Sequence, residues 1–240
     1  MPRRAAKKPD PSLDLSGHLS VLADDPAFAA APLHPRTLFP AAAADAPVEL
    51  EVGSGKGLFL TGAAAAAPER VFLGVEISHG YALMTAGRLA RRGLANARIV
   101  SGDGNVLVRR LFPDACLAAI HVYFPDPWWK ARHRKRRVLS DAFLAHAARV
   151  LAPSGTLHVW TDVEEYFREA LAAAAATGGF FPPEEVGERE AAHDLDYRTH
   201  FERRTRLAGQ PVWRARLGRS AAPARVSREP MPGPAPPAAD

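Results

Sequence analysis

Short apolar segments alternate with amphipathic stretches along most of this chain. The apolar segments have the length of strands and lie at residues 47–52, 71–75, 97–100, 118–124, 155–160 and 211–217. Apolar residues recur at helical spacing between them, for example over residues 138–151. This alternation predicts an α/β protein built on a doubly wound, mostly parallel, Rossmann-like sheet. We expect the last apolar segment to form a late antiparallel edge strand.

The length of 240 residues favours one folded domain with flanking segments over two domains. We expect the folded domain at residues 47–218. Residues 1–20 are rich in cations and predict a basic disordered arm. Residues 21–46 are expected to form a lead-in segment between this arm and the folded domain. The Pro- and Ala-rich residues 219–240 predict a disordered tail.

The net charge of the chain is +5 at pH 7, which favours an acidic partner, nucleic acid before membrane. No apolar run reaches the roughly 18 residues of a membrane span, so no membrane partner is expected. Cys116 is the only cysteine, which excludes an intrachain disulfide and fits a cytoplasmic location. Because Cys116 precedes a strand, we interpret it as a core residue, which disfavours a cysteine-dependent pyrimidine methylase.

Acidic residues follow the predicted strands repeatedly. The carboxyl ends of the strands form the ligand-binding edge of an open parallel sheet. The acids expected at that edge are Glu51, Glu76, Asp103, Asp126 and Asp162. Glycines after the first strand let the backbone turn tightly and approach a ligand. These glycines are Gly53, Gly55 and Gly57.

Two cofactors compete for this edge. A nicotinamide dinucleotide is normally held by G-x-G-x-x-G, with its pyrophosphate at a helix N-terminus. This chain has G-x-G-x-G preceded by Glu51, which would repel a pyrophosphate but suits the cationic end of S-adenosyl-L-methionine. Glu76 is placed to hydrogen-bond a ribose diol, and Asp103 to meet an adenine edge. The residues favour S-adenosyl-L-methionine over a nicotinamide oxidoreductase.

The segment HVYFPDPWWKARHRKRR, residues 121–137, joins a predicted strand to a dense block of cations. Pro125 and Pro127 confine the backbone on both sides of Asp126. A fixed carboxylate beside stacking rings and positive charge favours chemistry on a nucleobase. We expect the cations of the block to pair with backbone phosphates; they are Lys130, Arg132, Arg134, Lys135, Arg136 and Arg137. The alternative is a proline turn with packed tryptophans and a solvated charge run. Trp128 in particular either stacks on a base or packs under the loop.

These motifs resemble those of the bacterial tRNA (guanine-N7)-methyltransferases, in the same order, over residues 48–217. LEVGSGKG resembles the glycine motif of that family, FLGVE its ribose-binding strand and SGDGNVL its adenine-side loop. FPDPWWKARHRKRR resembles its most distinctive segment, and LHVWTDVEEY and THFERR resemble two further blocks. The resemblance implies an S-adenosylmethionine-dependent methyltransferase domain at residues 47–218. It also implies methylation of a guanine N7 in the variable loop of tRNA. Trp129 and His200 depart from residues common in the family.

The resemblance implies roles for individual side chains. The catalytic residue beside the methyl-transfer site would be Asp126. The cofactor-binding residues would be Glu51, Gly53, Gly55, Gly57, Glu76, Asp103 and Asp126. The substrate-binding residues would be Lys130, Asp162, Thr199, His200, Phe201 and Glu202. From the residues alone, Asp162 with Glu165 also resembles a helix capping box, and Glu202 a surface ion pair.

N7 of guanine carries a lone pair and no proton, so its methylation needs neither a base nor a covalent intermediate. A carboxylate such as Asp126 can stabilise the purine as it becomes cationic. Two alternatives stay open: a methylase acting on an exocyclic amine, because PDPW resembles the acidic motif of such enzymes, and a non-catalytic RNA-binding protein on the same fold. No spacing predicts a metal site, and the chain is expected to be a monomer or a homodimer.

Overall fold

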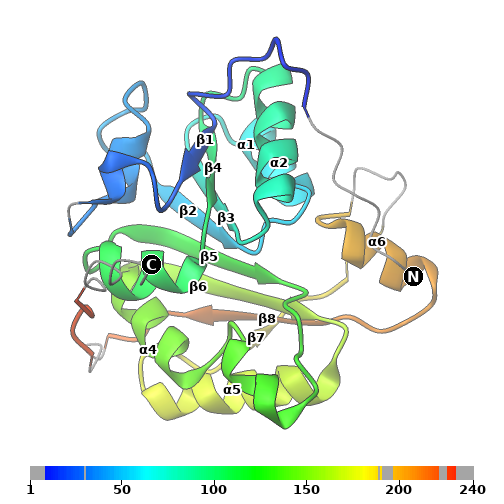
Figure 1. Ribbon diagram of the computed structural model, residues 1–240. Helices are drawn as coiled ribbons and strands as arrows, with labels where there is room; N and C mark the ends of the chain where they lie inside the picture. The colour runs from blue at the N-terminus through cyan, green and yellow to red at the C-terminus, as the bar shows by residue number, and fades with distance from the viewer. Residues whose placement is uncertain (1–8, 30, 189, 191–196, 222–225, 231–240) are drawn as a thin grey trace, which may run out of the picture.

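The computed structural model of the protein describes residues 9–29, 31–188, 190, 197–221 and 226–230. Over these residues eight strands form one sheet in the order β1-β4-β3-β2-β5-β6-β8-β7 (Figure 1). The strands are β1 (Leu19–Val21), β2 (Val48–Val52), β3 (Val71–Glu76), β4 (Ala97–Ser101), β5 (Leu117–Tyr123), β6 (Leu151–Thr161), β7 (Glu184–Glu185) and β8 (Trp213–Gly218). The predicted doubly wound, mostly parallel sheet is confirmed.

The connections reverse direction between β2 and β5. From β2 the chain moves outward to β3 and β4 and then returns to β5, which pairs in parallel with the other side of β2. The loops after β2 and β5 therefore diverge to opposite faces of the sheet. In open α/β sheets this divergence leaves a crevice at the carboxyl ends of the two strands, where ligands bind.

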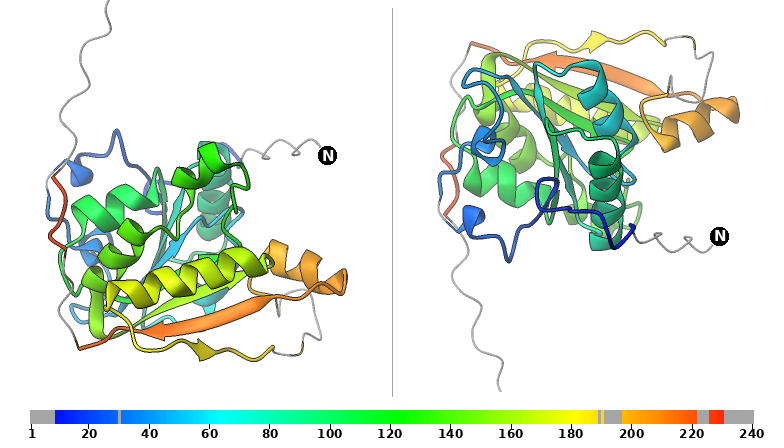
Figure 2. Two further views of the ribbon diagram at one scale, coloured as in Figure 1. Left: turned by 90° about the horizontal axis from the view of Figure 1, so that it is seen from below. Right: turned by 90° about the horizontal axis from the view of Figure 1, so that it is seen from above.

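Helices cover both faces of the sheet (Figure 2). α1 (Leu58–Ala66) and α2 (His79–Arg91) pack on one face, and α4 (Asp141–Val150), α5 (Glu164–Thr177) and η3 (Leu107–Leu111) on the other. The remaining short helices are η1 (Pro26–Phe28), η2 (Pro35–Leu38), α3 (Gly104–Val106), η4 (Ala131–Arg136) and α6 (His200–Leu207). In the part of the chain that the structure describes, none of these helices combines the length and the apolar character needed to span a membrane.

The predicted late antiparallel strand is confirmed as β8. It pairs with β6 along its whole length, with Trp160 opposite Arg214. The two-residue strand β7 pairs antiparallel with the outer side of β8. The carboxyl end of β6 therefore lies next to the start of β8, which follows directly on α6.

Disorder was predicted over residues 1–20, but residues 9–20 have a defined structure. β1 pairs in parallel with β4, and Pro9 contacts α2 so closely that a Cβ on Gly87 would lie 2.6 Å from it. Leu15 and Leu19 pack against the core under α2. Burial of these apolar side chains accounts for the order of the segment. Residues 1–8, which carry the cations of the predicted arm, lie outside the described residues.

Part of the predicted disordered tail also has defined contacts. Glu229 forms ion pairs with Arg109 and Arg110 of η3, and the Glu229 backbone N–H donates to the Arg109 carbonyl oxygen over 2.8 Å. Complementary charge holds residues 226–230 against this face. Residues 222–225 and 231–240 lie outside the described part of the chain.

Candidate active site

The carboxyl edge of the sheet brings together acids from four neighbouring strands. Glu51 is the penultimate residue of β2 and Glu76 the last residue of β3. Asp103 follows β4 by two residues, and Asp126 follows β5 by three. The four strands lie side by side in the order β4, β3, β2 and β5, and their chains run in the same direction. The predicted gathering of these acids at one edge is therefore observed.

Glu51 is buried at this edge with one carboxylate oxygen unpaired. Its exposed fraction is 3%, and Oε2 has no hydrogen-bond partner in the described structure. Burial raises the pKa of Glu51 to about 8; the charge of Glu76 adds to this rise, and Ser54 opposes it. An unpaired buried carboxyl oxygen is costly to leave unsatisfied. The site therefore favours a ligand that brings a cation or a hydrogen-bond donor to Oε2.

The glycine loop, residues 53–57, passes close above Glu51. Gly53, Gly55 and Gly57 adopt φ values of +82°, +53° and +71°, a region that side chains with a Cβ rarely enter. A Cβ on Gly57 would also lie 2.4 Å from Cγ2 of Thr85. The Thr85 hydroxyl donates to the Gly55 carbonyl oxygen over 3.2 Å, so α2 supports the loop from outside. The three glycines are thus required by backbone conformation, and the loop leaves space above β2.

Glu76 connects the glycine loop to the start of α2. Its Oε2 accepts from the Gly55 backbone N–H and its Oε1 from the Ser78 backbone N–H, both over 2.8 Å. Each oxygen keeps a second lone pair that can accept from a ribose hydroxyl. Asp103 is exposed and accepts from the Asn105 backbone N–H over 2.9 Å at the start of α3. Both carboxylates accept hydrogen bonds from nearby backbone N–H groups, and both lie at the edge where the cofactor is expected.

The turn after β5 presents Asp126 to solvent at the carboxyl edge. Phe124 and Trp128, the non-glycine residues on either side of the turn, have φ values of +51° and +45°. The Phe124 backbone N–H donates to the Trp160 carbonyl oxygen over 2.7 Å, which fixes the start of the turn to β6. Prolines at 125 and 127 restrict the rest of the turn. The turn therefore holds an exposed Asp126 on a restricted and strained backbone.

Trp128 packs against η4 and is half-buried. The Arg136 guanidinium lies 5.1 Å from the centroid of its ring, and the His133 ring contacts it edge-on at 5.7 Å. These contacts support the second of the two predicted alternatives for Trp128. The large ring that faces solvent is that of Trp129, whose exposed fraction is 61%.

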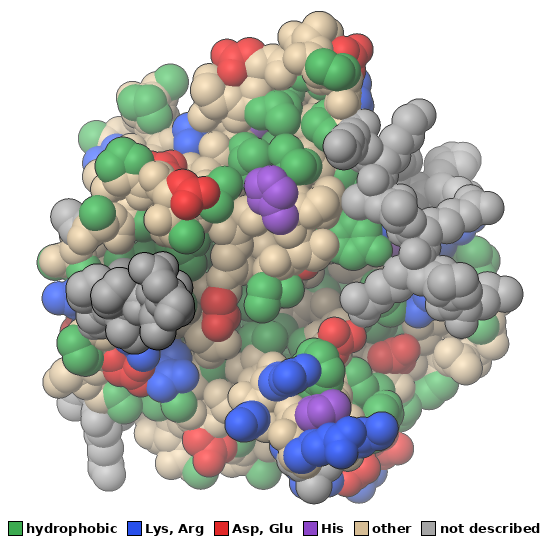
Figure 3. All heavy atoms as spheres, in the orientation of Figure 1, with side chains coloured by type: hydrophobic (Ala, Val, Ile, Leu, Met, Phe, Trp, Pro, Cys, Tyr) green, Lys and Arg blue, Asp and Glu red, His purple; other side chains and the backbone are tan. Residues whose placement is uncertain are grey.

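The cations of residues 130–137 divide into two groups. Figure 3 shows Lys and Arg side chains gathered where η4 lies, below the sheet in this view. Arg137 is fixed between the Pro127 carbonyl oxygen, Glu169 and the ring of Tyr166, and Arg134 lies near Glu165 and Glu169. Lys130, Arg132 and Lys135 are exposed. Part of the predicted phosphate-binding block therefore attaches η4 to α5.

Thr199 and Glu202 form the N-terminal cap of α6. The Thr199 hydroxyl accepts from the Glu202 backbone N–H over 2.9 Å, and Glu202 Oε2 accepts from the Arg198 backbone N–H over 2.7 Å. Glu202 is buried, and its Oε1 lies 3.3–3.4 Å from guanidinium nitrogens of Arg206 and Arg214. The alternative of a surface ion pair for Glu202 is therefore wrong. The spacing T-x-x-E was a visible capping signal.

The neighbours of Thr199 and Glu202 on α6 face outward. The Phe201 ring is 46% exposed and stacks on Phe124 with ring centroids 6.2 Å apart. His200 is exposed at the first position of the helix. Since Phe124 begins the turn that carries Asp126, this stack places α6 beside the candidate catalytic carboxylate.

Asp162 has no capping role in the structure. α5 begins after Val163, which has no side-chain cap, and the Val163 backbone N–H donates to the Thr161 hydroxyl over 3.2 Å. The alternative interpretation of Asp162 and Glu165 as a capping box is therefore wrong. Asp162 is exposed at the carboxyl end of β6, the strand next to β5. This position is compatible with the predicted role in substrate binding.

A buried polar network links α6 to the sheet, and the sequence motifs did not reveal it. Arg198 donates to the Tyr123 hydroxyl, and that hydroxyl lies 2.8 Å from Nδ1 of His121. His121 Nε2 lies 2.7 Å from Glu49 Oε2, and Arg70 contacts the other oxygen of Glu49. Burial would raise the pKa of Glu49, but His121 and Arg70 outweigh it and lower that pKa. The network thus crosses one face of the sheet from the start of β3 to the start of α6.

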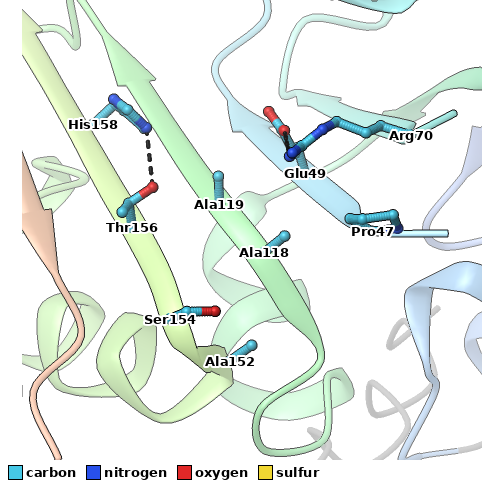
Figure 4. A pocket seen from close by; sticks show the side chains of 9 residues that line it. All are labelled: Pro47, Glu49, Arg70, Ala118, Ala119, Ala152, Ser154, Thr156 and His158. Carbon is cyan, nitrogen blue, oxygen red and sulfur yellow. Dashed lines mark hydrogen bonds and ion pairs between the residues drawn. The ribbon is translucent and has the colours of Figure 1, made fainter. Parts of the chain in front are cut away.

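Two hollows lie at the amino-terminal side of the sheet, away from the acidic edge. One of about 370 Å³ is lined by the amino-terminal halves of β2, β5 and β6 (Figure 4). His158, at its rim, hydrogen-bonds Thr156, and burial lowers the pKa of His158 to about 3. Cys116 is buried, and burial raises its pKa to about 12, as expected for a core residue. In the described ranges no group of three or more His, Cys, Asp or Glu residues is arranged to hold a metal ion.

Solved structures of methyltransferases share this fold. The 16S rRNA methyltransferase KamB aligns with a TM-score of 0.52 at 17% identity, over 72% of this chain and 88% of its own. A SAM-dependent O-methyltransferase from Thermotoga maritima aligns with a TM-score of 0.52 at 11% identity, over 78% of this chain and 63% of its own. At these identities the likeness concerns the fold alone. The chain therefore has the Rossmann-like fold of these methyltransferase structures.

Sequence comparison gives the family. Residues 45–215 match a family model described as a putative methyltransferase. A tRNA (guanine-N(7)-)-methyltransferase from Rhodopirellula baltica is 46% identical over 89% of this chain and 79% of its own length. An enzyme of the same name from Anaeromyxobacter dehalogenans is 44% identical over 71% of this chain and 84% of its own. The chain belongs to the tRNA (guanine-N(7)-)-methyltransferase family.

Proposed function

We propose that this protein transfers a methyl group from S-adenosyl-L-methionine to N7 of a guanine in the variable loop of tRNA. The relatives named tRNA (guanine-N(7)-)-methyltransferase, at up to 46% identity, support the reaction and the tRNA substrate. The observation that carries the choice of cofactor is Glu51, whose buried Oε2 lacks a partner at the carboxyl end of β2. A sulfonium donor with an ammonium group suits such an oxygen, whereas a pyrophosphate does not.

S-adenosyl-L-methionine supplies an electrophilic methyl group when it is bound. Glu51 and the backbone of Gly53, Gly55 and Gly57 would hold its amino-acid end. Glu76 would accept from the ribose hydroxyls, and Asp103 would contact the adenine side. The residues fit this cofactor because the unpaired oxygen of Glu51, the left-handed glycine turn and the remaining lone pairs of Glu76 line the same edge.

Asp126 would stabilise the guanine as it becomes cationic. A guanine N7 has no proton to remove, so the protein needs to orient the base and to provide negative charge near it. Asp126 is exposed on a turn that Pro125, Pro127 and the bond from Phe124 to Trp160 hold in place. A carboxylate fixed before the reaction costs little reorganisation when charge develops.

Substrate contacts would come from three elements around Asp126. Lys130 follows the turn after β5, and Asp162 follows β6. On α6 the outward-facing His200 and Phe201 would contact the RNA. Thr199 and Glu202 would act through the cap that orients this helix, because their side chains bond its backbone.

A cytoplasmic location fits an enzyme that acts on tRNA and a single buried thiol. We expect the enzyme to work as a monomer or a homodimer. No metal ion is needed for methyl transfer to an unprotonated nitrogen.

The test is methylation of an unmodified tRNA transcript with a labelled methyl donor, followed by nucleoside mapping. We expect label in 7-methylguanosine at one variable-loop position. A transcript made with 7-deazaguanosine lacks the N7 lone pair and serves as the control, which should take up no label. Label on an exocyclic amine would instead support the amine methylase. Absence of both label and calorimetric binding of S-adenosyl-L-methionine would support the non-catalytic RNA-binding protein.

A further inference from the structure

A second group of cations gathers on the face of the sheet opposite η4. Lys56 lies in the glycine loop, Arg88 on α2 and Arg203 on α6. The Arg88 guanidinium donates to the Lys56 carbonyl oxygen over 2.6 Å, which joins α2 to the loop. Both Lys56 and the neighbouring His200 are exposed.

α6 brings its cations to this loop. It lies beside α1 and α2 in the views of Figures 1 and 2. The Arg198 guanidinium, just before α6, lies 5.9 Å from the ring of Phe59 on α1. Burial lowers the pKa of His200, and the charges of Arg88, Lys56 and Arg203 lower it further. Cations on three separate elements therefore lie close enough to affect the imidazole of His200.

Two members of this group, Lys56 and Arg88, differ from the cations at η4 in their surroundings. Arg134 on η4 and Arg137 directly after it face the Glu169 carboxylate of α5. Lys56 and Arg88 form no ion pair with the residues that the structure describes. Clustered like charges repel one another and are stabilised by a bound anion. A polynucleotide backbone supplies anions at regular spacing.

We propose that Lys56, Arg88, His200 and Arg203 form a second phosphate-binding surface, the loop–α6 surface. It would bind a stretch of tRNA backbone different from the stretch bound by η4. η4 attaches to α5 on one face of the sheet, whereas the loop–α6 surface lies on the face of α1 and α2. A tRNA bound to both would cross the carboxyl edge where Asp126 lies. This inference rests on tRNA as the substrate.

The experiment measures binding of an unmodified tRNA transcript, without methyl donor, between about 50 and 200 mM salt. The variants are Arg203→Gln and Arg88→Gln. The matched control is Arg36→Gln, which removes the same charge on η2, where Arg36 lines a hollow at the amino ends of β2 and β5. Each loss of a phosphate contact should lower the slope of log K against log salt by about 1. We expect this decrease and weaker binding for Arg203→Gln and Arg88→Gln, and wild-type values for Arg36→Gln.

The inference is overturned if Arg203→Gln and Arg88→Gln keep the wild-type affinity and salt slope, or if Arg36→Gln lowers them equally. Omission of the methyl donor ensures that a change in cofactor binding through the glycine loop cannot produce the result. A different result is expected if tRNA is not the substrate. In that case the wild-type protein itself would neither bind the transcript with salt dependence nor methylate it.

Discussion

Arg198 donates a hydrogen bond to the hydroxyl oxygen of Tyr123 over 3.2 Å, and this contact joins the start of α6 to the carboxyl end of β5. The Arg198 guanidinium also lies 5.1 Å from the centroid of the Trp160 ring. The Tyr123 hydroxyl has its other partner in His121, deep on the sheet. α6 is therefore positioned by the same strand that carries Asp126 at its end.

Replacement of Arg198 by Ala should impair tRNA methylation more than stability. Without this contact α6 is no longer held at the end of β5, and misplacement of a substrate-positioning element can cost up to about a hundredfold in rate, so kcat/KM for tRNA should fall roughly tenfold to a hundredfold. The affinity for S-adenosyl-L-methionine should stay near the wild-type value because Arg198 does not contact the cofactor residues. Arg198→Lys keeps the charge and should recover part of the loss. Steady-state rates at varied tRNA, calorimetry and thermal melting measure these effects; an unchanged kcat/KM in Arg198→Ala would exclude the positioning role.

Replacement of Glu51 by Gln should stabilise the protein without cofactor as pH rises. The folded-state pKa of Glu51, about 8, is above the ordinary value of 4.5, so the folded state holds a proton that the unfolded state loses between these pH values. Wild-type stability should therefore fall relative to Glu51→Gln from about pH 4.5 to 8. A buried unsatisfied group costs on the order of 1–3 kcal/mol.

Thermal melting of both proteins at pH 5 and pH 8 measures this difference. The melting temperatures should be similar at pH 5 and should differ by several degrees at pH 8, with Glu51→Gln higher. The same variant should bind S-adenosyl-L-methionine much more weakly in calorimetry. A wild-type protein that melts above Glu51→Gln at pH 8 would contradict the assignment of an uncompensated carboxylate.

Replacement of Asp126 by Asn should lower turnover while both substrates still bind. Loss of one preorganised electrostatic group typically costs about 10²–10³ in kcat. Asp126 is exposed, so the melting temperature should change little. Single-turnover methylation with saturating tRNA and methyl donor separates this effect from binding. If Asp126→Asn turns over at the wild-type rate, Asp126 has no electrostatic role.

Lys135 and Arg137 should behave differently although both belong to the same basic block. Lys135 is exposed, and Lys135→Gln should reduce the salt dependence of tRNA binding with no change in melting temperature. Arg137 is held by Pro127, Glu169 and Tyr166, and its side chain is 9% exposed. Arg137→Gln should lower the melting temperature. Equal effects of the two variants on both measurements would show that the division of the block is incorrect.

Much of the fold and of the acidic edge could be predicted because the signals are local. A strand such as Val71–Glu76 reads as an apolar run, and Glu76 stands directly at its end. The same holds for Glu51 at the end of β2. Strands that run in parallel must bring such ends together, so the side chains converge without any knowledge of packing.

Other features depend on contacts between distant segments. β1 has three residues and is ordered by β4 and α2, about 80 positions further along the chain. Asp162 looked like a helix cap, but the Thr161 hydroxyl accepts the Val163 N–H instead. Both Thr161 and Asp162 carry a side-chain oxygen that can accept a bond from the backbone, and spacing alone does not determine which of them does.

The sequence by itself determined the order of the six predicted strands and of the helices between them, the glycine turn and the acids at the strand ends, because these follow from periodicity and backbone conformation. Only the tertiary structure decided which charged groups are free to meet a ligand. Glu202 is paired with Arg214 and Arg137 with Glu169, whereas Oε2 of Glu51 is left unpaired. Burial and charge pairing depend on residues from the entire fold. They therefore determine the protonation and the partners of a charged side chain, which its neighbours in sequence do not determine.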